Sequence, residues 1–179
     1  MSKIVVLLGK PGSGKDTQAS FISSTFNYKI IKTGDFVRGL AKKNTKITQI
    51  LQEGGLVDDE LVNQYVAAEI TKSPNDNYLT DGFPRDESQA RWFDDFLQRQ
   101  GKQVDLVLLL DLSDELAKTR LIKRGRADDQ ASIIDSRLDV YRSETTAVID
   151  YYEKQNKVIK INASPDPRTI NDSLREALK

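Results

Sequence analysis

The sequence of 179 residues contains no cysteine and no histidine. Without cysteine, the chain can form neither a disulfide bond nor a zinc site built on thiolates. Without histidine, it lacks the commonest general base and the commonest metal ligand. Any catalysis by this chain must therefore depend on lysine, arginine, carboxylate and hydroxyl side chains and on backbone amides.

The sequence also lacks a net charge and a long apolar segment. Lys and Arg together number 27, as do Asp and Glu, and this balance argues against a protein built mainly to bind nucleic acid or an anionic membrane. The early apolar run Ile4–Leu8 is too short to span a membrane and does not have the features of a signal peptide. We therefore expect a cytoplasmic monomer in which residues 1–179 form a single domain, with neither a nucleic-acid nor a membrane partner.

Apolar runs alternate with segments of helical character along the chain. Ile4–Leu8 and Val104–Leu110 are predicted to be buried parallel strands, and Tyr28–Ile31, Tyr78–Thr80 and Val158–Ile161 are weaker strand candidates. Strands that alternate with helices favour a parallel sheet covered on both faces. The sequence thus predicts a three-layer α/β/α fold with a five-stranded parallel sheet. The expected helices are Lys15–Phe26, Phe36–Lys43, Ile47–Glu53, Asp58–Thr71, Glu87–Gln100, Asp114–Arg124, Ile133–Gln155 and Pro167–Leu178.

A glycine-rich segment at residues 9–17 lies between the first predicted strand and the first predicted helix. Its GxxxxGK spacing in that context is typical of a phosphate-binding loop, although a plain turn is the alternative. Glycines let successive N–H groups turn inward, and the helix N-terminus attracts an anion. We expect Asp16 to face away from a triphosphate, because a carboxylate repels it. The candidate triphosphate-binding residues are Gly12, Ser13, Gly14, Lys15, Asp16 and Thr17.

Three further motifs follow at regular places. Thr33–Arg38 comes directly after the second strand, Gly54–Val62 lies further on, and Asp81–Arg85 follows the third strand, with Gln89 four residues beyond. In this order and at these spacings, the motifs resemble the adenylate kinase family from Ile4 to about Leu174. The resemblance implies a P-loop kinase that transfers a phosphoryl group from ATP to AMP with Mg²⁺ and gives two ADP.

The resemblance places an AMP-binding helical region at about residues 33–62. It implies that Arg38 and Arg85 bind the AMP phosphate, which suits their planar forks of donors. It also implies that Asp81 holds the water shell of Mg²⁺, an ion that prefers oxygen ligands. The backbone of residues 55–57 would meet ribose and adenine, and Gln89 would read the adenine edge. The full set of implied AMP-binding residues is Thr33, Gly34, Arg38, Gly55, Leu56, Val57, Gly82, Arg85 and Gln89.

The resemblance also places a short lid at about residues 124–130. Arg120 would stack on the adenine of ATP, Arg124 would contact ATP as well, and Ala163 would contribute a backbone group to the same nucleotide. A lid this short would close incompletely, so we expect slow ATP hydrolysis in the absence of an acceptor. The implied catalytic residues surround the transferred phosphate with positive charge, as phosphoryl transfer requires: Lys15, Arg85, Arg124, Arg126 and Arg137.

Other functions stay open on sequence grounds. UMP/CMP kinases usually have a small apolar residue and an asparagine at the positions of Thr33 and Gln89, so these two residues favour AMP. A P-loop kinase with a non-nucleotide acceptor is opposed by the motifs Thr33–Arg38 and Asp81–Arg85. A non-catalytic nucleotide-binding protein is opposed by the retained arginines. Thr33 could still serve only as a helix cap, and the arginines could form surface ion pairs.

Overall fold

A computed structural model describes residues 2–126 and 129–179, and these residues alternate between strands and helices. The strands are β1 (Ile4–Gly9), β2 (Tyr28–Lys32), β3 (Asn77–Asp81), β4 (Leu106–Asp111) and β5 (Val158–Asn162). The helices are α1 (Lys15–Phe26), α2 (Thr33–Ala41), α3 (Thr45–Gln52), α4 (Asp59–Lys72), α5 (Glu87–Gln98), α6 (Asp114–Arg124), α7 (Ala131–Val140), α8 (Thr146–Glu153) and α9 (Pro167–Ala177), and a π-helical turn, η1 (Tyr141–Thr145), joins α7 to α8.

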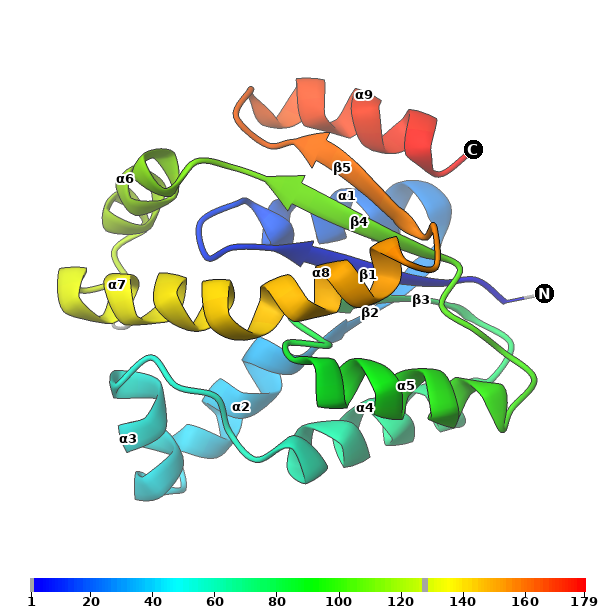
Figure 1. Ribbon diagram of the computed structural model, residues 1–179, viewed down its shortest axis with the longest axis horizontal. Helices are drawn as coiled ribbons and strands as arrows, with labels where there is room; N and C mark the ends of the chain where they lie inside the picture. The colour runs from blue at the N-terminus through cyan, green and yellow to red at the C-terminus, as the bar shows by residue number, and fades with distance from the viewer. Residues whose placement is uncertain (1, 127–128) are drawn as a thin grey trace.

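The strands pair in parallel in the order β2-β3-β1-β4-β5 (Figure 1). This confirms the predicted five-stranded parallel sheet. The chain first places β2 and β3 on one side of β1 and then returns past β1 to place β4 and β5 on the other side. A reversal of this kind leaves a crevice beside the carboxyl end of the first strand, where ligands bind in open α/β sheets.

Each face of the sheet packs against its own layer of helices. Ile4, Val6 and Leu8 of β1 belong to one apolar core with residues of α4, α5 and α8. Val5 and Leu7 point to the opposite core, which includes residues of α1, α6 and α9. Figure 1 shows α5 and α8 on one side of the sheet and α1 and α9 on the other. The predicted three-layer α/β/α architecture is therefore confirmed.

Two of the predicted helices differ from the structure in ways that bear on the site, whereas the others agree with their predicted bounds to within two residues. The helix expected to begin at Phe36 begins at Thr33, directly after β2. The long helix expected over 133–155 runs from Ala131 to Glu153 with the π-helical turn η1 in its middle. Such single turns often occur at functional sites, and Thr145 at the end of η1 donates a hydrogen bond to the carbonyl oxygen of Arg85 (3.0 Å). No helix in the described ranges is long and apolar enough to cross a membrane.

Candidate functional site

A cleft of about 980 Å³ opens at the carboxyl ends of the strands. This volume is at the upper end of the range for small-molecule sites, which suits two ligands side by side. Ser13 and Ala163 are fully buried and do not belong to the cleft wall. The other predicted site residues all line it: Gly12, Gly14, Lys15, Asp16, Thr17, Thr33, Gly34, Arg38, Gly55, Leu56, Val57, Asp81, Gly82, Arg85, Gln89, Arg120, Arg124, Arg126 and Arg137.

The helices of the fold differ in how they begin. In α3, α4, α5, α6 and α9, a side chain before the helix accepts hydrogen bonds from backbone N–H groups of the first turn. Each such cap stabilises a helix by about 1 kcal/mol. In the described part of the chain, α1, α2, α7 and α8 have no such cap. Helix α8 continues from η1, whereas α1, α2 and α7 follow Gly14, Lys32 and Gln130, which all line the cleft. Three helices thus begin at the wall of this cleft with N–H groups that no side-chain cap satisfies, and such groups can bind an anion.

The glycine-rich loop at residues 9–14 has the conformation that a phosphate-binding loop needs. Gly12 and Gly14 have φ angles of 85° and 92°, which residues with a side chain rarely adopt. A Cβ atom on Gly12 would lie 2.6 Å from the carbonyl oxygen of Ala117, so the loop packs closely on α6. The Ser13 N–H donates to the carbonyl oxygen of Lys10 (3.1 Å) and tightens the turn.

Lys15 is the first residue of α1, and its ammonium group folds back over the loop. Its Nζ donates to the carbonyl oxygens of Gly9 (2.5 Å) and Lys10 (3.1 Å). Burial lowers the pKa of Lys15 to about 8. The carboxylate of Asp81 opposes this shift, whereas the charges of Arg85 and Arg137 add to it. Asp16 also opposes the shift, so burial is the main reason that the protonated ammonium group is disfavoured. A phosphate bound beside Lys15 would favour its charged form.

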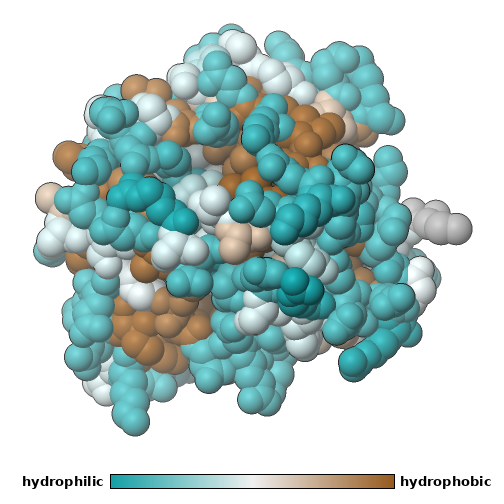
Figure 2. Space-filling view, in the orientation of Figure 1, coloured by the Kyte–Doolittle hydropathy of each residue, from teal (hydrophilic) through white to brown (hydrophobic). Residues whose placement is uncertain are grey.

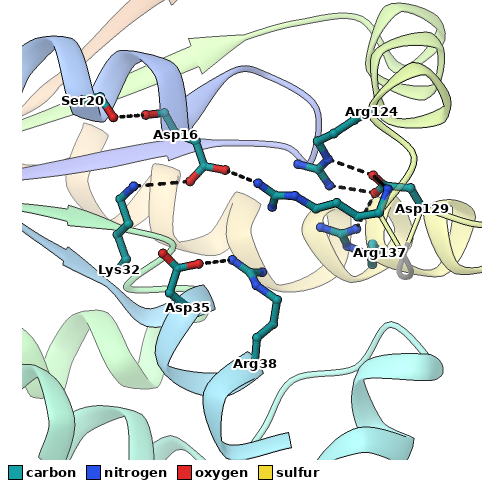
Figure 3. Close-up of polar contacts among 9 residues, drawn as sticks. Asp16, Ser20, Lys32, Asp35, Arg38, Arg124, Asp129 and Arg137 are labelled. Atoms are coloured by element: carbon teal, nitrogen blue, oxygen red, sulfur yellow. Dashed lines mark hydrogen bonds and ion pairs between the residues drawn. The ribbon is translucent and has the colours of Figure 1, made fainter. Parts of the chain in front are cut away.

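Several basic side chains of the cleft are paired with carboxylates (Figure 3). Asp35 accepts from Arg38 Nη2 at 2.6 Å. The fully buried Asp129 accepts from Arg124 at 2.7 and 2.8 Å and from Arg137 at 3.3 Å. Burial alone would raise the pKa of Asp129, but the Arg124 side chain and the N–H of Arg126 hold it below its ordinary value. The buried Asp129 therefore orients Arg124 and Arg137, whereas Arg38 and Asp35 form an exposed pair that a ligand can replace.

The expectation that Asp16 faces away from the phosphate site is wrong. Its carboxylate lines the cleft, accepts from Arg126 Nη2 at 2.9 Å and lies 3.9 Å from Lys32 Nζ. Burial would raise the pKa of Asp16, but the hydrogen bond and charge of Arg126 and the charge of Lys32 lower it. Asp16 therefore turns inward because two cations face it, and it links the loop to the predicted lid. Residues 127 and 128 of that lid lie outside the described residues.

The end of β3 organises the other half of the cleft. The hydroxyl of Thr33 donates to the carbonyl oxygen of Gly82 (2.8 Å), and Arg85 Nε donates to the same oxygen (2.9 Å). Gly82 has a φ of 79°, and a Cβ atom there would lie 3.1 Å from Thr33 Oγ1. Glycine is therefore required for this close approach. Thr33 does not cap α2, because its hydroxyl donates to the carbonyl oxygen of Gly82, just after β3.

Gln89 lies on α5 beside this group and is almost fully buried. Its Oε1 accepts from the N–H of Arg85 (2.9 Å), and its Nε2 donates to Asp59 Oδ1 (2.7 Å). Leu51, Leu56 and Val57 are half-buried in the cleft wall and form an apolar surface. Figure 2 shows apolar surface gathered at the lower left, over α3. This half of the cleft combines an apolar wall with an amide, which suits a flat base.

Arg120 and Ala163 are tied to each other. Arg120 donates to the carbonyl oxygens of Ala163 (2.8 Å) and Ser164 (3.0 Å), and the N–H of Ala163 donates to the carbonyl oxygen of Asp111 (2.7 Å). Both backbone polar groups of Ala163 are therefore bonded within the protein. A contact between Ala163 and ATP stays a prediction, as does stacking of Arg120 on its adenine.

No role in the site was predicted from the sequence for four residues that shape it: Lys32, Asp35, Asp59 and Asp129. Asp35 and Arg38 have the i, i+3 spacing of helical ion pairs, which is a usable signal. Lys32 and Asp16, like Asp59 and Gln89, are brought together only by the folded chain.

Comparison with known proteins agrees with this geometry. The family model described as adenylate kinase matches residues 7–157. The chain is 35% identical to an adenylate kinase of Synechococcus sp. (strain WH7803), over 99% of this chain and 100% of the relative. It is 36% identical to an adenylate kinase of Leuconostoc mesenteroides subsp. mesenteroides, over 99% and 98% of the two chains. It is 34% identical to adenylate kinase 1 of Nostoc sp. (strain PCC 7120), over 97% of both chains.

Proposed function

This chain belongs to the adenylate kinase family, and from that premise we propose that it transfers the γ-phosphoryl group of ATP to AMP and produces two ADP. The observation that carries this proposal is the single cleft that joins a phosphate-binding loop to a second polar and apolar half. A cleft for one nucleotide would not need both halves.

In the proposed complex, ATP occupies the side of the cleft formed by α1 and α6. The N–H groups at the start of α1 and the ammonium of Lys15 bind its phosphates. Arg120, held by the carbonyl oxygens of residues 163–165, lies at the base end of this half. The incoming triphosphate competes with Asp16 for Arg126. When ATP binds, the ion pair between the loop and the predicted lid is therefore replaced by contacts with the nucleotide.

AMP occupies the side formed by α2, the segment 54–57 and the end of β3. Its base packs on the apolar wall and meets the amide of Gln89. Its phosphate binds Arg85 and takes Arg38 from Asp35. Burial lowers the pKa of Arg85, and the nearby charges of Arg137 and Arg38 add to the effect. A phosphate dianion between these guanidinium groups relieves that repulsion.

The reaction needs little beyond alignment and charge. An oxygen of the AMP phosphate forms a bond to the γ-phosphorus while the bond to the bridging oxygen of ADP breaks. A phosphate monoester with a second pKa of about 6 is already deprotonated near pH 7, so no histidine is required. Lys15, Arg124 and Arg137 supply positive charge where the three equatorial oxygens pass between the nucleotides.

The residues present suit a magnesium ion that accompanies ATP. Asp81 is a nearly buried carboxylate at the end of β3, and burial raises its pKa while Lys15 opposes the shift. No cluster of three or more acidic side chains in residues 2–126 and 129–179 could hold a metal alone. Magnesium usually binds one or two protein oxygens and keeps several waters. Asp81, through water, and the hydroxyl of Thr17 would hold it, and the ion would neutralise phosphate charge.

A thermal-shift experiment tests whether one cleft binds both nucleotides. The probe is a dinucleotide in which five phosphates join two adenosines. If its concentration is 1,000 times its Kd, linkage adds about 4 kcal/mol to the stability, or roughly 10 °C in Tm for a chain of this size. The shift should exceed the shifts for saturating ATP or AMP. A shift no larger than that of ATP alone would favour a nucleotide-binding protein with one site.

Two finer points complete the proposal. Thr33 and Gln89 favour AMP over UMP and CMP, since hydrogen-bond readout discriminates strongly between bases. We also propose that the protein acts as a cytoplasmic monomer. The balance of its charges argues against a nucleic-acid partner. Gel filtration with light scattering tests the oligomeric state, and a mass of about twice the 20.2 kDa of the chain would contradict it.

A further inference from the structure

The amide group of Gln89 is held at both of its polar atoms. Oε1 accepts from the backbone N–H of Arg85, and Nε2 donates to the carboxylate of Asp59. A backbone N–H can only donate and a carboxylate can only accept. Rotating the amide by half a turn would therefore bring two donors together on one side and two acceptors together on the other. The two partners allow one orientation of the amide.

Asp59 is itself fixed between two helices. It is the first residue of α4, and its Oδ2 lies 2.7 Å from the hydroxyl of Ser88 on α5. That hydroxyl lies 2.8 Å from Asp86 Oδ1, and Asp86 caps α5 by accepting from the N–H of Gln89 (2.9 Å). The hydroxyl of Ser88 has one proton, which it can donate to either carboxylate, and it thereby links the start of α4 to the start of α5. Asp59 is its link to the amide in the cleft.

The fixed amide keeps hydrogen-bonding capacity for a ligand. Each of its two bonds uses one N–H or one oxygen lone pair, and the side chain makes no further hydrogen bond to the described residues. One N–H and one lone pair stay available. In this orientation, the oxygen can accept from an amino group while the nitrogen donates to an unprotonated ring nitrogen. A keto base presents the reverse pattern, an oxygen next to a ring N–H.

We infer that Asp59 is a positioning residue that sets the acceptor base. By fixing the amide of Gln89, it selects a base edge with an amino group, as in adenine, against a keto edge, as in hypoxanthine, guanine or uracil. Cytosine shares the amino edge, so Asp59 does not separate AMP from CMP. The inference rests on the proposed AMP site and specifies how that site reads its base.

The test compares AMP with inosine monophosphate in the wild-type protein and in Asp59→Asn. These two acceptors differ at the keto oxygen that replaces the amino group and at the protonated ring nitrogen beside it. Asparagine can donate as well as accept, so the amide of Gln89 can rotate by half a turn at a lower cost in free energy. The ratio of kcat/KM for AMP to that for inosine monophosphate should fall about tenfold. The KM for AMP should rise, and the KM for ATP should stay unchanged.

Glu87→Gln is the matched control. Glu87 lies in the first turn of α5, two residues from Gln89, and its carboxylate pairs with Arg91 at 2.5 Å. The variant removes one acidic charge near the site without touching the amide, and its ratio should equal that of the wild type. Ser88→Ala removes a hydrogen bond to Asp59 without changing the charge of Asp59. It should lower the ratio of kcat/KM for AMP to that for inosine monophosphate by about twofold.

The outcomes separate the inference from the proposed function. The inference is supported if the ratio of kcat/KM for AMP to that for inosine monophosphate falls in Asp59→Asn and stays unchanged in Glu87→Gln. An unchanged ratio in Asp59→Asn, or an equal loss for both acceptors with a raised KM for ATP, overturns it and leaves the kinase activity standing. Absence of ADP formation from AMP in the wild-type protein contradicts the proposed function instead.

Discussion

Replacing Lys15 by methionine should remove activity and yet stabilise the protein in the absence of nucleotide. Lys15 is half-buried, and burial lowers its pKa from 10.5 to about 8; the charges of Arg85 and Arg137 add to this shift, and the carboxylates of Asp81 and Asp16 oppose it. At about 1.4 kcal/mol per pH unit, this corresponds to an upper bound of about 3 kcal/mol. Solvent screens part of that energy at a half-buried site, so we expect a gain of about 2 kcal/mol near pH 7, or roughly 4–8 °C in Tm.

The sign of the pH dependence distinguishes this cause from better packing of methionine. Below about pH 8, Lys15 carries its proton in both the folded and the unfolded chain, and the full destabilisation is present. Between about pH 8 and 10.5, the folded protein loses the proton while the unfolded chain keeps it. The free energy of unfolding of the wild type should therefore rise relative to that of Lys15→Met. The difference should shrink by more than half between about pH 7 and 9.5.

Urea denaturation of the two proteins at both pH values measures this difference directly. A Lys15→Met protein that is less stable than the wild type near pH 7 would refute the account of Lys15. A difference that stays constant with pH would also refute it, because packing does not titrate. Loss of phosphoryl transfer in the variant serves as the check that the ammonium group is also required in the reaction.

Three further predictions concern Asp16, Arg85 and the short lid. Asp16→Gly should lower the KM for ATP severalfold, because ATP then binds Arg126 without first breaking its ion pair with Asp16. The free energy of unfolding should change by less than about 1 kcal/mol. An unchanged KM in steady-state assays would count against the proposal that ATP replaces Asp16 at Arg126. Arg85→Ala should lower kcat by about 10²–10³ without lowering the midpoint of urea denaturation, and wild-type turnover would remove Arg85 from the mechanism. ATP with Mg²⁺ and no acceptor should release ADP slowly, because a short lid excludes water incompletely, and undetectable release over hours would refute this.

The architecture was predictable because its signals are local. The apolar runs, the glycine-rich loop and the polar motifs each occupy a few consecutive residues, and the alternation of strands and helices limits their arrangement to few topologies. The predicted positions of β1 and α1 agree with the structure to within a residue. The start of α2 was less predictable, because Thr33 bonds to carbonyl groups 48 and 49 residues away.

The orientation of Asp16 was the main error at the site, and its cause lies outside any local pattern. The sequence showed an acidic residue beside a phosphate-binding lysine and indicated repulsion. The structure brings Arg126, 110 residues away, to the same carboxylate. Asp59 was overlooked for a similar reason. Its place among acidic residues at the start of a helix indicates a favourable interaction with the helix dipole, and only the folded chain places it against Gln89.

The central claim is that one cleft transfers a phosphoryl group from ATP to AMP. The most direct test measures ADP formation from ATP and Mg²⁺ with AMP, UMP, CMP, dTMP and GMP offered in turn. The account predicts a large preference for AMP. A preference for UMP or CMP would keep the fold and the phosphate chemistry but contradict the assignment of Thr33 and Gln89. No ADP above the rate with ATP alone, for any acceptor, would contradict the claim itself.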